Sequence, residues 1–164
     1  MTKKTETKLA WHWLAVGSSG KPVLRDGTLL RKRVWLRYKW EPKICERGLH
    51  GSYTALDALK YAPGCYVTRV KVAAIHAEQD DKFVCKERMP LWGYDATAVI
   101  LKWSKRVALD VVSLWDCPAV VLEFLNGDDT KAAAAAGASA EKTSLYNTWL
   151  EEMLEENRAG NDRD

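Results

Sequence analysis

The sequence predicts an α+β fold: an antiparallel, β-rich N-terminal half with one short helix, followed by an α-helical C-terminal half. Two observations carry this prediction. Apolar and polar residues alternate with period two, as in strands, through much of the chain up to Arg88. After Pro90, apolar residues recur at helical spacing and an alanine-rich run appears. Strands followed by helices, instead of alternating with them, are typical of the α+β class.

The first elements are predicted strands. Residues 1–8 form a polar lead-in that we expect to be disordered. The sequence WHWLAVG at 11–17 alternates and predicts a strand, and the turn-forming residues of 18–27 follow. The stretch TLLRKRVWLRYKW at 28–40 is rich in aromatic and β-branched residues with period-two character. It predicts one or two further strands.

The stretch CERGLHGSYTALDALKYAPG, residues 45–64, combines turn and helix signals. Gly48 and Gly51 predict a sharp turn around Leu49-His50, because glycine reaches backbone conformations closed to other residues. Thr54 and an aspartate three residues later fit the capping box of a short helix, which a Pro-Gly pair ends. We therefore expect a turn followed by a short helix over 54–62.

The remaining elements continue this pattern. Residues 65–77 and 82–88 predict two strands of a hairpin that covers the short helix. Helices are predicted over 96–109, from near Pro118, and through the alanine run 132–136. A final amphipathic helix carries an apolar stripe made of Leu145, Trp149, Leu150 and Met153.

Length and composition suit one globular domain with an appended segment. The chain has 164 residues, of which 47% are apolar, enough to bury a core without disulfides. We expect an α+β domain over 9–127 and an alanine-rich, acidic helical extension over 128–164. The N-terminal MTKKTETK is not followed by an apolar segment, and no run of 18 apolar residues occurs. These features predict a cytoplasmic protein without a membrane span.

Charge is distributed unevenly along the chain. The net charge is +3, but residues 141–164 hold seven acids and three bases, so the preceding 140 residues carry +7. Residues 31–43 hold six bases and one acid, interleaved with aromatic side chains. Bases pair with phosphates and exposed aromatic rings stack on nucleobases, although a half-buried strand with a solvated basic face has the same pattern. The partner-binding residues predicted here share one face of the strand: Arg33, Trp35, Arg37 and Lys39.

Several motifs resemble those of a known family. The segments CERGLHGS, DALKYAPG, DDKFV and KER, with SLWDCPAVVLEFL further on, resemble a domain family of unknown function that is common in tailed-phage and prophage proteins. The likeness covers roughly residues 11–153. It implies a phage or prophage context, but it implies no particular chemistry.

Three interpretations compete for His50. In the first, the ring hydrogen-bonds backbone carbonyl groups and holds its loop. In the second, LHGSY resembles the His-Gly-Ser/Thr strand end with which ADP-ribosyltransferases hold NAD. That resemblance implies His50 on a ribose hydroxyl and Tyr61 or Tyr53 on the nicotinamide. The glutamate that this chemistry needs is unassigned, because Glu123, the late candidate, lies in a segment predicted to be helical.

The third interpretation is a zinc site. Its ligands would come from Cys45, His50, Cys65 and Cys85, but no two of them show the close spacing of a zinc knuckle. Isolated cysteines in strands are usually small core residues. We therefore predict no metal and no resident cofactor, and we expect the four cysteines to be free thiols.

These observations favour a phage- or prophage-type accessory protein that binds a macromolecular partner. The expected partner is a host or phage protein, such as a host factor, with nucleic acid as the alternative. An ADP-ribosyltransferase-like enzyme that uses NAD and a virion-associated structural protein are the competing hypotheses. The apolar stripe of the last helix also predicts a homo-oligomer formed through that helix.

Overall fold

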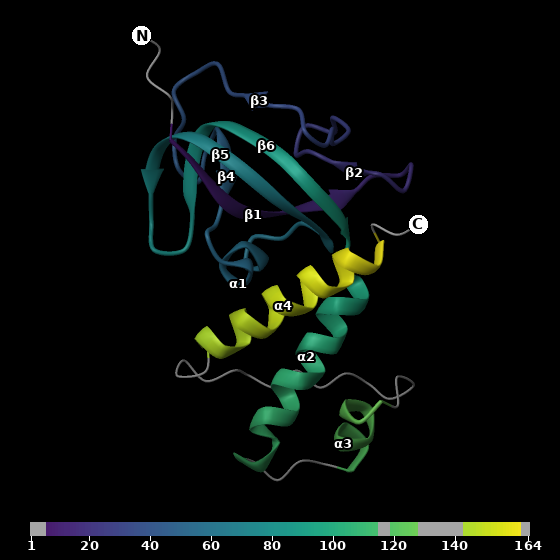
Figure 1. The fold of residues 1–164 in the computed structure, drawn as a ribbon. Coiled ribbons are helices and arrows are strands. Elements are labelled where there is room, and N and C mark those ends of the chain that lie inside the picture. The colour runs from purple at the N-terminus through teal and green to yellow at the C-terminus, as the bar shows by residue number, and fades with distance from the viewer. Residues whose placement is uncertain (1–5, 115–118, 128–142, 162–164) are drawn as a thin grey trace. The chain divides into compact units, whose positions relative to one another are not determined.

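The computed structural model describes residues 6–114, 119–127 and 143–161 (Figure 1). The chain forms two compact units, Met1–Ala96 and Thr97–Asp164. Strands fill the first unit and helices the second, which confirms the predicted α+β class and the order of its two halves. The division at 96/97 differs from the predicted boundary at 127/128. That boundary adjoins residues outside the described part of the chain, so it stays a prediction.

Three long antiparallel strands form the centre of the first unit. The hairpin predicted over 65–88 is confirmed, because β5 (Tyr66–Glu78) pairs antiparallel with β6 (Phe83–Asp95). On the other side of β5 lies β1 (Thr7–Val16). Short strands extend the sheet: β2 (Pro22–Val23) pairs with β1, while β3 (Leu36–Arg37) and β4 (Leu49–Gly51) pair with β6.

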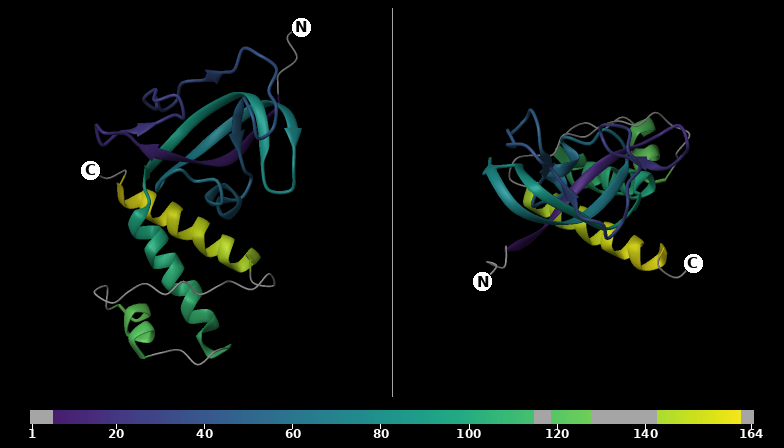
Figure 2. Two further views of the ribbon diagram at one scale, coloured as in Figure 1. Left: turned by 180° about the vertical axis from the view of Figure 1, so that it is seen from behind. Right: turned by 90° about the horizontal axis from the view of Figure 1, so that it is seen from above.

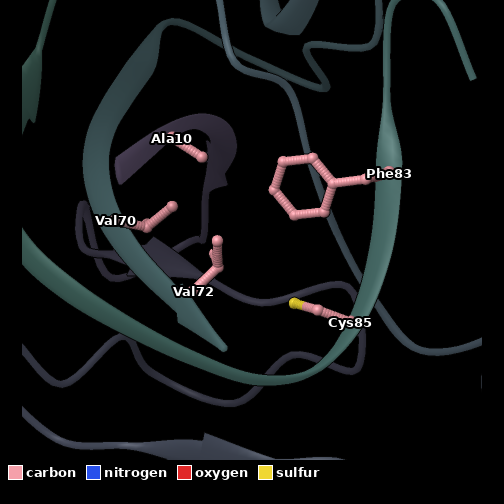
Figure 3. Packing of buried hydrophobic residues seen from close by; sticks show 5 residues of the cluster. All are labelled: Ala10, Val70, Val72, Phe83 and Cys85. Carbon is pink, nitrogen blue, oxygen red and sulfur yellow. The ribbon is translucent and has the colours of Figure 1, made fainter. Parts of the chain in front are cut away.

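The sheet curls into a half-barrel around an apolar core. Two backbone hydrogen bonds between Ser52, just after β4, and Trp11 of β1 bring the two sides of the curl together, with N···O distances of 2.8 and 3.1 Å. Gly51 permits this approach, because a Cβ there would lie 2.9 Å from the Phe83 ring and 3.3 Å from the Trp11 carbonyl oxygen. The core side chains from β1, β5 and β6 point toward one another (Figure 3): Ala10, Val70, Val72, Phe83 and Cys85.

The short helix α1 (Ala55–Leu59) follows β4 and begins as predicted. The Thr54 hydroxyl oxygen accepts a hydrogen bond from the Asp57 backbone N–H at 3.1 Å, which satisfies one of the free donors at the helix start. Ala55 and Ala58 are buried, and the main neighbour of the helix is β1. The helix therefore packs mainly on β1, and the end of the predicted 54–62 segment meets the 65–88 hairpin through Lys60 and Tyr61, which both contact Asp81.

The second unit is helical. It contains α2 (Thr97–Val111), a single 3₁₀ turn η1 (Val112–Leu114), α3 (Ala119–Leu125) and α4 (Thr143–Asn161). Figure 2 shows α2 and α4 crossing. Their contact buries Val107, Val111 and Tyr146, with Trp103 and Trp149 packed alongside. The predicted alanine-run helix lies outside the described residues.

Three details differ from the sequence-based expectations. The lead-in is shorter than expected, because β1 already begins at Thr7. The strand expected at 82–88 continues through Pro90 to Asp95. Proline has no N–H to donate to a neighbouring strand, and it is tolerated here because the pairing of β5 with β6 shifts register between Arg69 and Val70, opposite Pro90.

The largest difference concerns residues 28–40. Only Leu36 and Arg37 pair as a strand, and Arg33 has a φ of 60°, in the left-handed region that ends an extended run. The Arg33 N–H and the Tyr38 N–H donate to the carbonyl oxygens of Pro90 and Lys86 at 2.6 and 2.8 Å. The segment therefore follows β6 through a few contacts, and the regular two-faced strand that we expected is absent.

Candidate functional site

Residues 31–43, which we call the basic segment, form the most strongly charged stretch of the first unit. All six of its bases are exposed: Arg31, Lys32, Arg33, Arg37, Lys39 and Lys43. Arg37 pairs with Glu87, with 3.1 Å between Nε and Oε1, and Lys43 pairs with Glu46. Among the described residues, no acidic side chain pairs with the other four bases. Most of this positive charge is thus available to an outside partner.

The aromatic side chains of the basic segment do not follow the predicted alternation. Trp35, one of the predicted partner-binding residues, is half-buried, whereas Trp40, which period-two alternation places on the opposite face from Trp35, is 68% exposed. The Tyr38 and Trp40 rings meet edge to face, with centroids 5.5 Å apart and planes at 62°. Because the strand pairing stops at Arg37, the chain beyond it is free to turn Trp40 toward solvent. The exposed aromatic of this surface is therefore Trp40, whereas the predicted partner-binding set contained Trp35.

His50 lies in β4, opposite Val84 of β6, and its ring holds the preceding loop. The His50 Nε2 accepts a hydrogen bond from the Cys45 backbone N–H at 3.2 Å. Burial is the main cause that lowers the pKa of His50, followed by the positive charge of Arg88, while a hydrogen bond to the Gly48 backbone opposes both. Cys45 needs this support, since its φ is 66°.

Tyr61, the second residue of the enzyme hypothesis, is half-exposed and bound elsewhere. Its hydroxyl donates to Asp81 Oδ2 at 2.7 Å, and the Lys82 ammonium lies 4.2 Å from the ring centroid. Hydrogen bonds with Cys45 and then with Tyr61 raise the pKa of Lys82. Cys45, which binds the His50 ring, is thus also a neighbour of Lys82, which contacts Tyr61. Among the described residues, no glutamate in this group supplies the carboxylate that the enzyme hypothesis needs.

The two best-formed pockets of the described residues do not support the enzyme hypothesis. One open pocket of about 480 Å³ is lined by Glu6, by Lys8 of β1 and by residues 74–78 of β5, and another of about 310 Å³ lies on the helical unit. Neither pocket is lined by His50 or Tyr61. Glu123 is exposed on α3, a helix as predicted, and belongs to the other unit.

The cysteines that we considered as metal ligands have different environments. Cys45 and Cys65 are exposed free thiols, whereas Cys85 is a buried core residue whose Sγ contacts the Leu49 carbonyl oxygen at 3.2 Å. Burial raises the pKa of Cys85 to about 11. Within the described ranges, no group of three or more His, Cys, Asp or Glu side chains is arranged to hold a metal ion.

Next to this region lie the buried Arg88 and the half-buried His12, which were not identified from the sequence. Arg88 is only 5% exposed, and its Nη1 donates to the His50 carbonyl oxygen. Burial lowers the pKa of Arg88 to about 10. Burial, the Arg88 charge and His50, in that order, hold the pKa of His12 well below its usual value. In an alternating strand, an arginine is expected on the solvent side. The burial of Arg88 therefore could not be predicted from the strand pattern and is seen only in the tertiary structure.

No protein-family model, curated protein or solved structure shows a significant match to this chain. The resemblance to the phage and prophage family therefore stays a prediction. Among the helices of the described residues, none is long and apolar enough to cross a membrane.

Proposed function

We propose that this protein acts by binding an anionic macromolecular partner through the basic segment, as a phage- or prophage-type accessory protein. The observation that carries the proposal is the exposure of six bases on one segment, four of them without an acidic partner in the described residues. A host or phage macromolecule with a negatively charged surface fits this site.

The charge of the whole first unit supports the same function. Residues 1–96 contain eighteen bases and ten acids, a formal charge of +8, whereas residues 97–164 contain seven bases and twelve acids, a charge of −5. Surface charge of one sign attracts an oppositely charged partner over distances of about a Debye length and accelerates their encounter. The free bases need not break an internal ion pair before they engage a partner.

No described feature favours the ADP-ribosyltransferase-like alternative to a comparable degree. The His50 ring is engaged with the Cys45 N–H, and it lines neither of the two pockets described above. The virion-component and homo-oligomer hypotheses also stay predictions. Within the chain itself, Trp149 of α4 packs beside Val107 and Val111, and the Arg106 guanidinium carbon lies 3.9 Å from its ring centroid.

A charge-matched pair of variants tests the proposed function. The variant R33N/R37S/K39S removes three bases from the basic segment, with asparagine at 33 because it tolerates a positive φ. The control K8S/K60S/K102S removes three exposed bases elsewhere, so both variants have the same net charge. We expect the first variant to elute from immobilised heparin at clearly lower salt than the control. Equal elution would show that only net charge matters and would refute the basic segment as the binding site.

A further inference from the structure

The proposed function does not say whether the anionic partner is a protein or a nucleic acid. The exposed side chain of Trp40 favours a nucleic acid. We infer that the basic segment binds single-stranded nucleic acid, with a base stacked on Trp40 and phosphates contacted by the neighbouring cations. This inference rests on the proposed function, because it concerns the same surface. It adds a specific chemical role for the aromatic ring, which attraction to negative charge alone does not need.

Trp40 is exceptional among the tryptophans of this chain. Of the seven within the described residues, it is the only exposed one: Trp11 and Trp13 are buried and the other four are half-buried. Its main aromatic neighbour is Tyr38, in an edge-to-face contact. A single contact of this kind covers at most one face of the indole, so at least one face stays open to a planar ligand. Exposed aromatic rings of this type stack on nucleobases of any sequence.

Cations flank this ring along the chain. Lys39 precedes it directly, Arg37 lies three residues before it and Lys43 three residues after it, all of them exposed. Arg37 and Lys43 are exposed, and their partners Glu87 and Glu46 are half-buried and exposed, respectively. Ion pairs at such solvent-accessible positions are weak and easily exchanged for a phosphate. Alternating bases and aromatic rings on one segment are the combination found in proteins that hold single strands.

The local backbone favours a single strand over a duplex. Residues 24–48 contain no helix, and their only strand is the two-residue β3. Reading of a duplex groove usually employs a helix or a β-ribbon, and duplex bases are stacked on one another and cannot stack on Trp40. An acidic protein surface would satisfy the cations equally well, but it would give the open tryptophan face no planar partner.

Fluorescence anisotropy with four labelled probes tests this inference. The probes are a dT 12-mer, an rU 12-mer, a hairpin duplex and a polyglutamate peptide, titrated with the full chain at several salt concentrations. Trp40→Leu keeps an apolar side chain but removes the ring, whereas Trp40→Phe keeps a ring. Because Trp40 is 68% exposed, both variants should unfold at the wild-type temperature.

We expect the single strands to bind more tightly than the duplex and the peptide, and comparison of dT with rU identifies the preferred sugar. Trp40→Leu should weaken single-strand binding by roughly 5- to 150-fold, the range of one stacking contact. Trp40→Phe should restore most of it, and polyglutamate binding should not change. The variant R33N/R37S/K39S should weaken every probe and reduce the slope of log affinity against log salt for single strands by about two.

The outcomes separate the two proposals. If polyglutamate binds as well as the single strands and Trp40→Leu has no effect, the partner is an acidic protein. The inference then fails while the proposed function stands. A duplex that binds as tightly as dT and rU would also overturn the single-strand inference. If R33N/R37S/K39S leaves the binding of all four probes unchanged, both proposals fail.

Discussion

The buried surroundings of His12 predict a loss of stability in mild acid. Because the pKa of His12 is held well below its usual value, the folded protein keeps this imidazole neutral, whereas an unfolded histidine titrates near 6.5. A lowered histidine pKa means that the unfolded state binds more protons as the pH falls. The stability is therefore full above about pH 7 and decreases as the pH falls through 6.5.

The size of the effect follows from linkage. Between pH 7 and pH 5, an unfolded histidine gains about 0.7 of a proton, and folded His12, with its lowered pKa, gains fewer. Integrated over this range, the difference lowers the free energy of unfolding by up to about 2 kcal/mol. His50 adds to this loss with the same sign, since its pKa is lowered as well. Carboxylates with lowered pKa values, such as Asp81, add their own loss only at lower pH.

Urea unfolding followed by tryptophan fluorescence measures this loss, because five of the eight tryptophans lie in residues 1–96. His12→Gln is neutral at every pH and keeps a polar side chain. His76→Gln is the matched control, since the His76 side chain is 38% exposed and pairs with the exposed Glu41. The wild type and His76→Gln should lose about 2 kcal/mol or more between pH 7 and pH 5, and His12→Gln should lose less than half as much.

Comparing each variant with itself at two pH values removes any constant cost of the substitution. An undiminished loss in His12→Gln would refute the reasoning, because it would mean that His12 is protonated in the folded state or that other groups cause the acid sensitivity.

Two further predictions concern the core of the first unit. Cys85 is buried and its pKa is raised to about 11, so it should react with iodoacetamide far more slowly than the exposed Cys45. Peptide mass spectrometry measures both rates, and equal rates would contradict the burial of Cys85. Gly93→Ala should destabilise the protein by about 1–3 kcal/mol, because the new Cβ would lie 2.6 Å from the Val67 carbonyl oxygen. In Gly160→Ala on α4 the Cβ meets no atom within 4 Å, and alanine favours a helix more than glycine does, so this control should keep or slightly raise the wild-type urea midpoint.

Local patterns were sufficient for much of the fold. The alternation of 65–77 predicted β5, and Thr54 with Asp57 predicted the start of α1, because period-two burial and helix capping depend on neighbours within a few residues. Gly48 does have an unusual backbone conformation, with a φ of 119°. The sharp turn predicted around Leu49-His50 is wrong, because both residues belong to β4, which pairs with β6. The same local patterns identified the basic segment as a charged stretch with aromatic residues.

The tertiary structure decided three features of the candidate site: the exposure of Trp40, the burial of Arg88 and the contact of the His50 ring. Leu36 pairs with Arg88, 52 positions later in the chain, and the ladder stops one residue beyond, so the alternation expected over 28–40 has no second strand to maintain it. Composition and spacing determined which residues carry charge and aromatic rings. Which of them face solvent was decided by strand pairing between distant segments, because a side chain in a short edge segment takes its direction from the few backbone hydrogen bonds that anchor it.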